Sequence, residues 1–162
     1  MMKPILLTIG HSRRTQEEFV ELLWVHGVSC VVDVRSLPRS RCVPHFNREQ
    51  MEVWVPEAGV SYRWLPALGG LRNPAKESPH PNLRNPRFRA YADYMLTAEF
   101  DRALDDLLAI AADERIAIMC AEAVPWKCHR WLISDALVSR GYQVEHILST
   151  GERKVHDISL LI

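Results

Sequence analysis

The segment "IAIMCAEAVPWKCHRWLISDAL", residues Ile116–Leu137, decides how this chain is expected to fold. Its first five residues form an apolar run that ends at Cys120, which is typical of a strand buried on both faces of a sheet. A turn follows, and then an amphipathic run that begins near Lys127. The segment therefore predicts a strand, a turn and a helix, which is the repeating unit of a parallel sheet.

A helical pattern, a glycine and an apolar run follow one another three times along the chain. The first helix is expected to begin at the capping box Thr15-x-x-Glu18 and to end at Gly27. The other two end at Gly59 and Gly141, and a further helix is expected around residues 100–111. The expected strands occupy residues 5–10, 30–34, 60–65, 115–120 and 142–148.

This alternation predicts an α/β fold, a single domain over residues 1–162 with three α/β/α layers and a mainly parallel, roughly five-stranded sheet. Residues 66–86 contain five prolines and are expected to form a long loop, either a binding loop or a disordered segment. Residues 151–162 could form an edge strand or a packed tail, with His156 facing the site or water.

The composition describes an ordinary globular protein. The chain has 162 residues, 48% of them hydrophobic, and a formal net charge of zero, so no overall field favours nucleic acid or a membrane. No apolar run reaches the roughly 20 residues of a membrane span. We expect a cytoplasmic protein whose four cysteines are reduced, because their spacing does not resemble a disulfide framework.

Charge is uneven along the chain. Residues 61–91 contain six arginines and lysines against Glu77 alone, whereas residues 93–114 contain seven acidic residues against Arg102 alone. Two solvated faces of opposite sign would explain this pattern. A basic mouth over an anionic ligand, with an acidic helix behind it, would explain it equally well.

In an open parallel sheet, ligands bind beyond the carboxyl ends of the strands. The first expected strand ends at Gly10, and His11 and Ser12 follow it as either a plain turn or ligand contacts. Arg35, Arg39 and Arg41 follow the second strand in one connection. Guanidinium groups in such a connection favour bidentate capture of phosphate or carboxylate, although a solvated loop is the alternative.

Asp33 is the acidic residue of an otherwise apolar strand. A buried acid needs a partner, and Arg35 lies two residues further along the same face. The two can form a structural ion pair. Alternatively, Asp33 is a base or a ligand-orienting acid whose pKa the neighbouring arginines lower.

The turn after Cys120 carries several reactive side chains. Cys120 or Cys128 could be a nucleophile assisted by His129 and Glu122, or both could be apolar filler. The same four residues could bind a metal, although their spacing is not that of a structural zinc site. Ligand contact through Glu122, Trp126, His129 and Arg130 is a further possibility, since an indole and a guanidinium can clamp a base or sugar ring.

Several blocks together resemble the bacterial "domain of unknown function 488" family. They are "TIGHS", "VVDVRSLPRSR", "YRWLPALGGLR", "FRAYADYM" and "MCAEAVPWKCHRWLISDAL", and the resemblance extends from about Ile5 to about Ile147. It implies an α/β domain and the importance of the CAEA-P-x-x-CHR block. That block consists here of Cys120, Ala121, Glu122, Ala123, Pro125, Cys128, His129 and Arg130.

The sequence thus favours an enzyme, a hydrolase or group transferase, with a nucleotide-like or phosphorylated small molecule at the carboxyl edge of the sheet. Arg35, Arg39, Arg41 and Arg130 would hold the anion, and Tyr91, Tyr94 or Trp126 would stack on it. The alternatives are a nucleic-acid-binding or nucleic-acid-processing module, a metal-binding protein and a regulatory domain without turnover. No cofactor, oligomeric state or specific substrate follows from these patterns.

Overall fold

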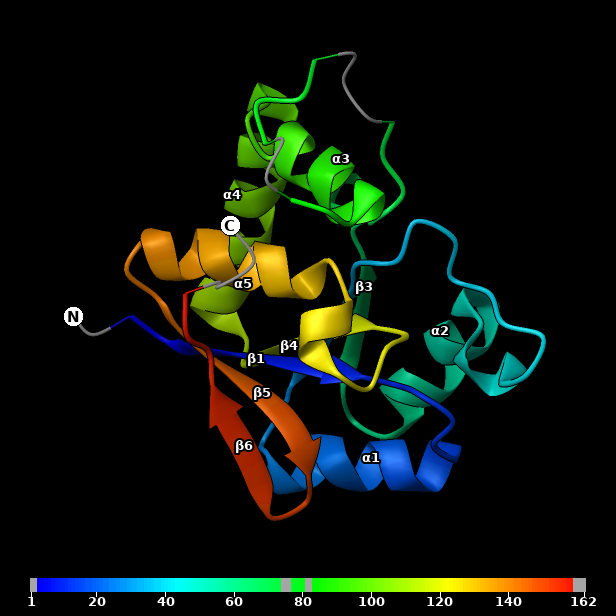
Figure 1. The fold of residues 1–162 in the computed structure, drawn as a ribbon. Coiled ribbons are helices and arrows are strands. Elements are labelled where there is room, and N and C mark those ends of the chain that lie inside the picture. The colour runs from blue at the N-terminus through cyan, green and yellow to red at the C-terminus, as the bar shows by residue number, and fades with distance from the viewer. Residues whose placement is uncertain (1–2, 74–76, 81–82, 159–162) are drawn as a thin grey trace.

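The computed structural model describes residues 3–73, 77–80 and 83–158. Within these residues the chain forms a six-stranded, mostly parallel sheet in the order β3-β2-β4-β1-β5-β6 (Figure 1). The strands are β1 (Ile5–Gly10), β2 (Cys30–Asp33), β3 (Ser61–Trp64), β4 (Ile116–Cys120), β5 (Gln143–Ser149) and β6 (Glu152–Val155). All neighbouring strands in the described sheet run parallel except β5 and β6, which form an antiparallel pair.

Five α-helices and three 3₁₀ helices connect the described strands. The α-helices are α1 (Gln16–Val25), α2 (Arg48–Glu57), α3 (Pro86–Tyr94), α4 (Ala98–Asp113) and α5 (Arg130–Ser139). The short 3₁₀ helices are η1 (Pro44–Phe46), η2 (Pro66–Leu68) and η3 (Pro125–Lys127). The first helix begins as the sequence indicates, because the Thr15 side chain accepts from the Glu18 N–H and the Glu18 carboxylate accepts from the Thr15 N–H.

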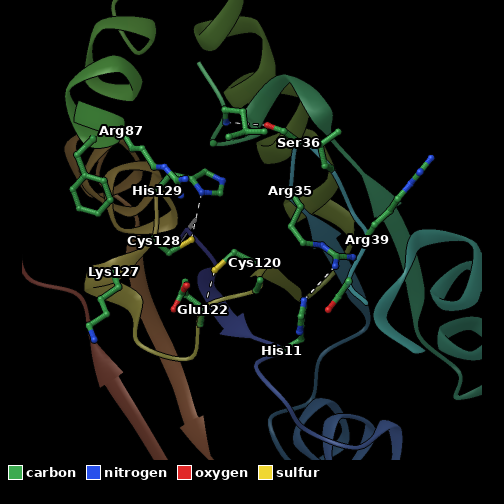
Figure 2. Close-up of a pocket in the computed structure, with 16 residues that line it drawn as sticks. His11, Arg35, Ser36, Arg39, Arg87, Cys120, Glu122, Lys127, Cys128 and His129 are labelled. Carbon is green, nitrogen blue, oxygen red and sulfur yellow. Dashed lines mark hydrogen bonds between the residues drawn. The ribbon is translucent and has the colours of Figure 1, made fainter. Parts of the chain in front are cut away.

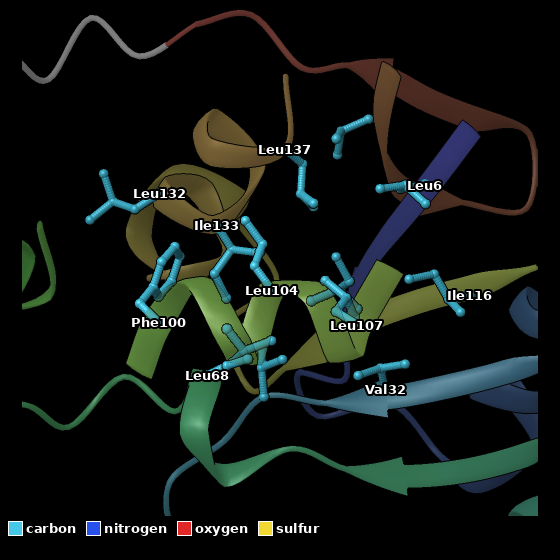
Figure 3. Packing of buried hydrophobic residues seen from close by; sticks show 14 of the residues in the cluster. Leu6, Val32, Leu68, Phe100, Leu104, Leu107, Ile116, Leu132, Ile133 and Leu137 are labelled. Carbon is cyan, nitrogen blue, oxygen red and sulfur yellow. The ribbon is translucent and has the colours of Figure 1, made fainter. Parts of the chain in front are cut away.

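The helices pack against the sheet through two separate apolar clusters. One cluster joins strand residues such as Val32 and Ile118 to α3, α4 and α5, and Figure 3 shows Leu104 and Ile133 within it. The other joins alternate strand residues, such as Val31, to α1 and α2. This division follows from the strand period of two, which sends successive side chains to opposite faces.

Two parts of the fold differ from the sequence-based expectation. The described sheet contains six strands where five were expected, because residues 152–155 pair with β5 at the edge. A helix that was not expected, α3, begins at Pro86, where the expected proline-rich loop ends, with the Asn85 side chain as its N-cap. Residues 66–68 form η2, while residues 74–76 and 81–82 of the expected loop lie outside the described residues.

None of the helices in the described ranges is both long enough and apolar enough to span a membrane.

Candidate functional site

A pocket of about 400 Å³ lies at the carboxyl ends of the three adjacent strands β2, β4 and β1 (Figure 2). The turn before α5, the loop after η2 and the start of α3 complete its wall. It is lined by His11, Arg35, Ser36, Leu37, Arg39, Ser40, Gly70, Leu71, Arg87, Phe88, Cys120, Ala121, Glu122, Lys127, Cys128 and His129. Segments far apart in the sequence therefore meet at the sheet edge where ligands of such folds bind.

Gly10 allows the turn after β4 to pass directly over the end of β1. The two strands are in register at this point, with Gly10 beside Cys120. A Cβ atom at Gly10 would overlap the carbonyl oxygen of Glu122. The N–H groups of His11 and Ser12 donate to the carbonyls of Cys120 and Ala121, each at 2.9 Å, so the two connections support one another.

Cys120 lies next to a completely buried arginine. The Nε of Arg130 donates to the Cys120 sulfur at 3.0 Å, and its Nη2 donates to the carbonyls of Glu122 at 2.8 Å and Ala123 at 3.2 Å. Arg130 has a relative exposure of 0%. Among the residues that the structure describes, it makes no ion pair with a carboxylate, so the thiol is the group beside it that can carry a compensating charge.

The surroundings of Cys120 favour its thiolate. Burial alone would raise the pKa of Cys120, but the neighbouring Cys128 thiol and the charge and Nε–H of Arg130 outweigh it and lower the pKa to about 7. Cys128 shows the opposite behaviour, because burial and the neighbouring Cys120 raise the pKa of its thiol well above the usual range. One member of the pair is thus prepared to lose its proton and the other to keep it.

His129 is held in one tautomer by the backbone. Its Nε2 lies 2.7 Å from the Val34 carbonyl oxygen, which can only accept, so Nε2 carries the hydrogen. Burial and then the nearby Arg130 and Arg72 lower the pKa of His129 to about 4, although the Val34 carbonyl opposes them, and the ring is neutral at pH 7. Its Nδ1 is therefore an acceptor, 3.4 Å from the Cys128 sulfur.

Asp33 and Arg35 form a fully hydrogen-bonded ion pair beside the pocket. Nε and Nη2 of Arg35 donate to the two Asp33 carboxylate oxygens at 2.9 and 2.7 Å, and the Tyr62 hydroxyl donates to Asp33 as well. Nη1 of Arg35 donates to Nε2 of His11 at 3.2 Å. Arg35 reaches the pocket wall, whereas Asp33 is buried behind it.

His11 is a neutral acceptor toward Arg35. Its Nδ1 donates to the Ser12 carbonyl at 2.8 Å, and burial lowers the pKa of His11 to about 4 although that hydrogen bond opposes the change. The ring also stacks on Phe46, with 4.5 Å between the ring centroids. These contacts fix the orientation of His11 on the pocket wall.

The mouth of the pocket is basic. The exposed residues Arg39, Arg87 and Lys127 line it together with one acid, Glu122. In the described ranges, none of these four side chains takes part in an ion pair. Leu37 and Leu71 add exposed apolar surface, so the mouth could accept a ligand with both an anionic and an apolar part.

The structure brings eight of the fourteen sequence-derived candidates together, seven on the pocket wall and one directly behind it. They are His11, Arg35, Arg39, Cys120, Glu122, Cys128 and His129 on the lining, with Arg130 directly behind Cys120. Six other candidates do not line it: Ser12, Asp33, Arg41, Tyr91, Tyr94 and Trp126. The hydroxyls of Tyr91 and Tyr94 donate to the carbonyls of Leu68 and Ala67, so both tyrosines support the loop after β3.

Sequence reasoning missed several lining residues. Arg87 and Lys127 could have been noticed, because Arg87 belongs to the basic stretch and Lys127 precedes Cys128. Ser36 belongs to the same connection as Arg35 and Arg39, whereas Leu37 and Leu71 carry no comparable sequence signal. Cys120, Cys128, His129 and Glu122 share the pocket, but within the described part of the chain no three His, Cys, Asp or Glu side chains form a group that could hold a metal ion.

The fold and the site together define an α/β protein with a buried cysteine–arginine pair at the carboxyl edge of a mostly parallel sheet. The chain belongs to the family described as Domain of unknown function DUF488, whose family model matches residues 15–137. No curated protein matched the chain. No solved structure matched it either.

Proposed function

We propose that the protein is a cysteine-dependent enzyme, a hydrolase or group transferase, that acts on a small anionic molecule of phosphorylated or nucleotide-like type. Cys120 is the nucleophile. Arg39, Arg87 and Lys127 at the mouth bind the anionic part of the substrate, with Arg35 on the wall. The electrophilic atom then lies over the Cys120 sulfur on the pocket floor.

One observation carries this proposal: the positive charge of the completely buried Arg130 faces the sulfur of Cys120 at 3.0 Å. A buried charge is costly unless an opposite charge compensates it. Deprotonation of Cys120 supplies that charge, and the thiolate is the nucleophilic form of cysteine.

The two thiols and the carboxylate of the pocket suit nucleophilic attack. The Cys120 thiolate would form a bond to the electrophilic carbon or phosphorus while the leaving group departs with the bonding electrons. Cys128, which retains its proton, is the nearest acid for the leaving group. Glu122, exposed on the pocket wall, would remove a proton from the water or acceptor group that then displaces the substrate fragment from sulfur. Solvent would take that proton from Glu122 and return one to Cys128, which restores both groups for the next turnover.

The test combines binding with covalent trapping. Phosphate, sulfate and nucleotides are screened by thermal shift against the protein, Arg39→Ala and Arg48→Ala, where Arg48 is an arginine outside the pocket lining. Stabilisation that Arg39→Ala reduces and Arg48→Ala keeps supports the anion site. Once a substrate is found, Cys120→Ser must abolish turnover, and intact mass spectrometry must detect an adduct on Cys120; full activity of Cys120→Ser would refute the mechanism.

A neighbouring hollow supports nucleic-acid binding as a second candidate function. It shares Leu37, Arg39 and Ser40 with the pocket and adds Arg41 and Asn47, so the basic surface extends beyond one small ligand. A single-stranded oligonucleotide could follow this surface with its phosphates. Retention of an oligonucleotide at low salt that Arg41→Ala weakens would support this candidate, whereas no retention would remove it.

A further inference from the structure

A chain of buried hydrogen bonds leads away from Cys120 through residues that do not line the pocket. It begins at Arg130, whose Nη1 donates to the hydroxyl oxygen of Thr8 at 2.6 Å. That oxygen lies 2.6 Å from Nδ1 of His146 on β5. Thr8 and His146 are both completely buried and face each other in the parallel pairing of β1 with β5.

The chain continues to the segment that follows β6. Nε2 of His146 lies 2.8 Å from Nδ1 of His156, and Nε2 of His156 lies 2.7 Å from a carboxylate oxygen of Asp135 on α5. His156 is 5% exposed. Trp131 covers both rings, stacked on His146 at 5.3 Å and edge-to-face with His156 at 4.3 Å between centroids.

The hydrogens of this chain can be assigned from its two ends. The Asp135 carboxylate only accepts, so His156 donates to it through Nε2. At the other end Arg130 only donates, so the Thr8 hydroxyl oxygen accepts from its Nη1. The contacts of His146 with Thr8 and with His156 join these two ends into one continuous buried chain, in which neighbouring hydrogen bonds strengthen one another.

The charges around the chain are consistent with a neutral His146. Burial, followed by the charges of Arg130, His156 and Lys154, lowers the pKa of His146 to about 3. Lys154 lies opposite His146 in the β5–β6 pairing, and Asp135 is the carboxylate that the chain reaches on α5. Arg130 and Lys154 thus face His146 from two elements, whereas the Asp135 carboxylate is separated from His146 by the ring of His156.

We propose that Thr8, His146 and His156 are positioning residues that hold the Arg130 Nε–H on the Cys120 sulfur and thereby keep Cys120 as a thiolate. The inference rests on the proposed role of Cys120 as nucleophile. A guanidinium has five N–H donors in a rigid plane, so fixing Nη1 on Thr8 also fixes the direction of Nε. Without that acceptor the guanidinium is held only through Nη2, on the carbonyls of Glu122 and Ala123, and Nε can turn away from the sulfur.

The test measures the pKa of Cys120 directly. Thiolate absorbance in the ultraviolet is titrated against pH, and the curve of the matching Cys120→Ser protein is subtracted so that only Cys120 contributes. Thr8→Val replaces the hydroxyl by a methyl group and should raise the pKa of Cys120 by about one unit or more, toward the value of about 8.5 of a free cysteine. Thr8→Ser restores the hydroxyl and should return the pKa to that of the parent protein.

A second variant tests the distant end of the chain. His156→Gln should raise the pKa of Cys120 in the same direction by a smaller amount. His26→Gln is the matched control, because His26 is 8% exposed and its Nε2 bonds the Ser149 carbonyl at 2.7 Å outside the chain. An unchanged Cys120 pKa in folded Thr8→Val and His156→Gln, or an equal rise in His26→Gln, would overturn the proposal.

This result is independent of the proposed reaction. The titration needs no substrate, so a rise in pKa would establish the positioning role even if Cys120→Ser kept full activity on a substrate. Conversely, loss of activity in Cys120→Ser with an unchanged pKa in Thr8→Val would leave the proposed function intact and remove the positioning role. If Thr8→Val does not fold, His156→Gln against His26→Gln decides the matter.

Discussion

Arg35 and Arg130 are two buried arginines beside the same pocket, and their partners differ. Arg35 binds both oxygens of the Asp33 carboxylate, so its charge is neutralised within a closed pair. Arg130 binds a thiol, a hydroxyl and two carbonyls. The difference shows that one arginine stabilises structure near the site, while the other places a positive field on a group that can react.

The largest effect on folding stability is expected from breaking the buried Asp33–Arg35 ion pair. Asp33→Asn would leave Arg35 buried without its counter-charge, and breaking a buried pair in this way costs about 3–5 kcal/mol of folding free energy. Chemical denaturation would measure the loss. Glu52→Gln is the control, because the Glu52 carboxylate pairs with Nε of Arg48 at 3.4 Å and both side chains are accessible to solvent. Such pairs contribute about 0–1 kcal/mol. Equal small losses of unfolding free energy in both variants would contradict the distinction between the buried and the exposed ion pair.

A medium effect is expected from the pH dependence of the Cys120–Arg130 pair. The pKa of Cys120 is lowered in the fold to about 7, below the value of about 8.5 in an unfolded chain. Between these two pKa values the unfolded state binds more protons than the folded state. The free energy of unfolding should therefore rise as pH increases from about 7 to about 8.5 and fall as pH decreases through 7. At about pH 8.5 the pair should add about 2 kcal/mol to the free energy of unfolding.

Cys120→Ser provides the comparison for this prediction, because serine does not titrate there. The difference in unfolding free energy between the parent and Cys120→Ser should grow across the window. Above about pH 8.5 the raised pKa of Cys128 should begin to oppose the gain, because the unfolded state then loses a proton that the fold retains. A pH-independent difference would mean that Arg130 does not stabilise a thiolate.

The smallest effect is expected at the exposed mouth. Arg39→Ala should leave folding stability within about 0.5 kcal/mol of the parent, because an exposed substitution of this kind removes no packing. Binding of an anionic ligand should weaken by at most about fivefold and less at high salt, since exposed charges are screened. Titration at two salt concentrations would check this. A salt-independent loss would indicate that Arg39 makes a desolvated contact instead.

The sequence predicted those elements that bury apolar residues. The runs that became β1, β2 and β4 are buried along almost their whole length, and the period of α4 places Phe100, Leu104 and Leu107 on one face. In contrast, β6 is exposed at every residue and is held by backbone pairing with β5, so hydrophobic periodicity could not locate it. Helix α3 lay within a proline-rich context, although Asn85 followed by Pro86 is a recognisable helix start.

The site was predictable to a similar degree and for similar reasons. Strand ends identified Arg35 and Cys120, because parallel strands deliver the residues that follow them to one edge. The direction in which Arg130 points could not be read from the chain. It depends on Thr8, 122 residues away, and on the carbonyls of the turn. A spacing in the sequence gives no information about such long-range contacts.

The charged residues of β6 also affect whether a strand of another protein molecule can pair with this edge of the sheet. Exposed sheet edges can recruit a strand from another chain and so begin aggregation. At this edge Glu152, Arg153 and Lys154 are exposed along the strand. An incoming strand would have to bring its own side chains against these charges. We therefore expect β6 to act as a barrier to strand-to-strand association and to favour solubility at high concentration.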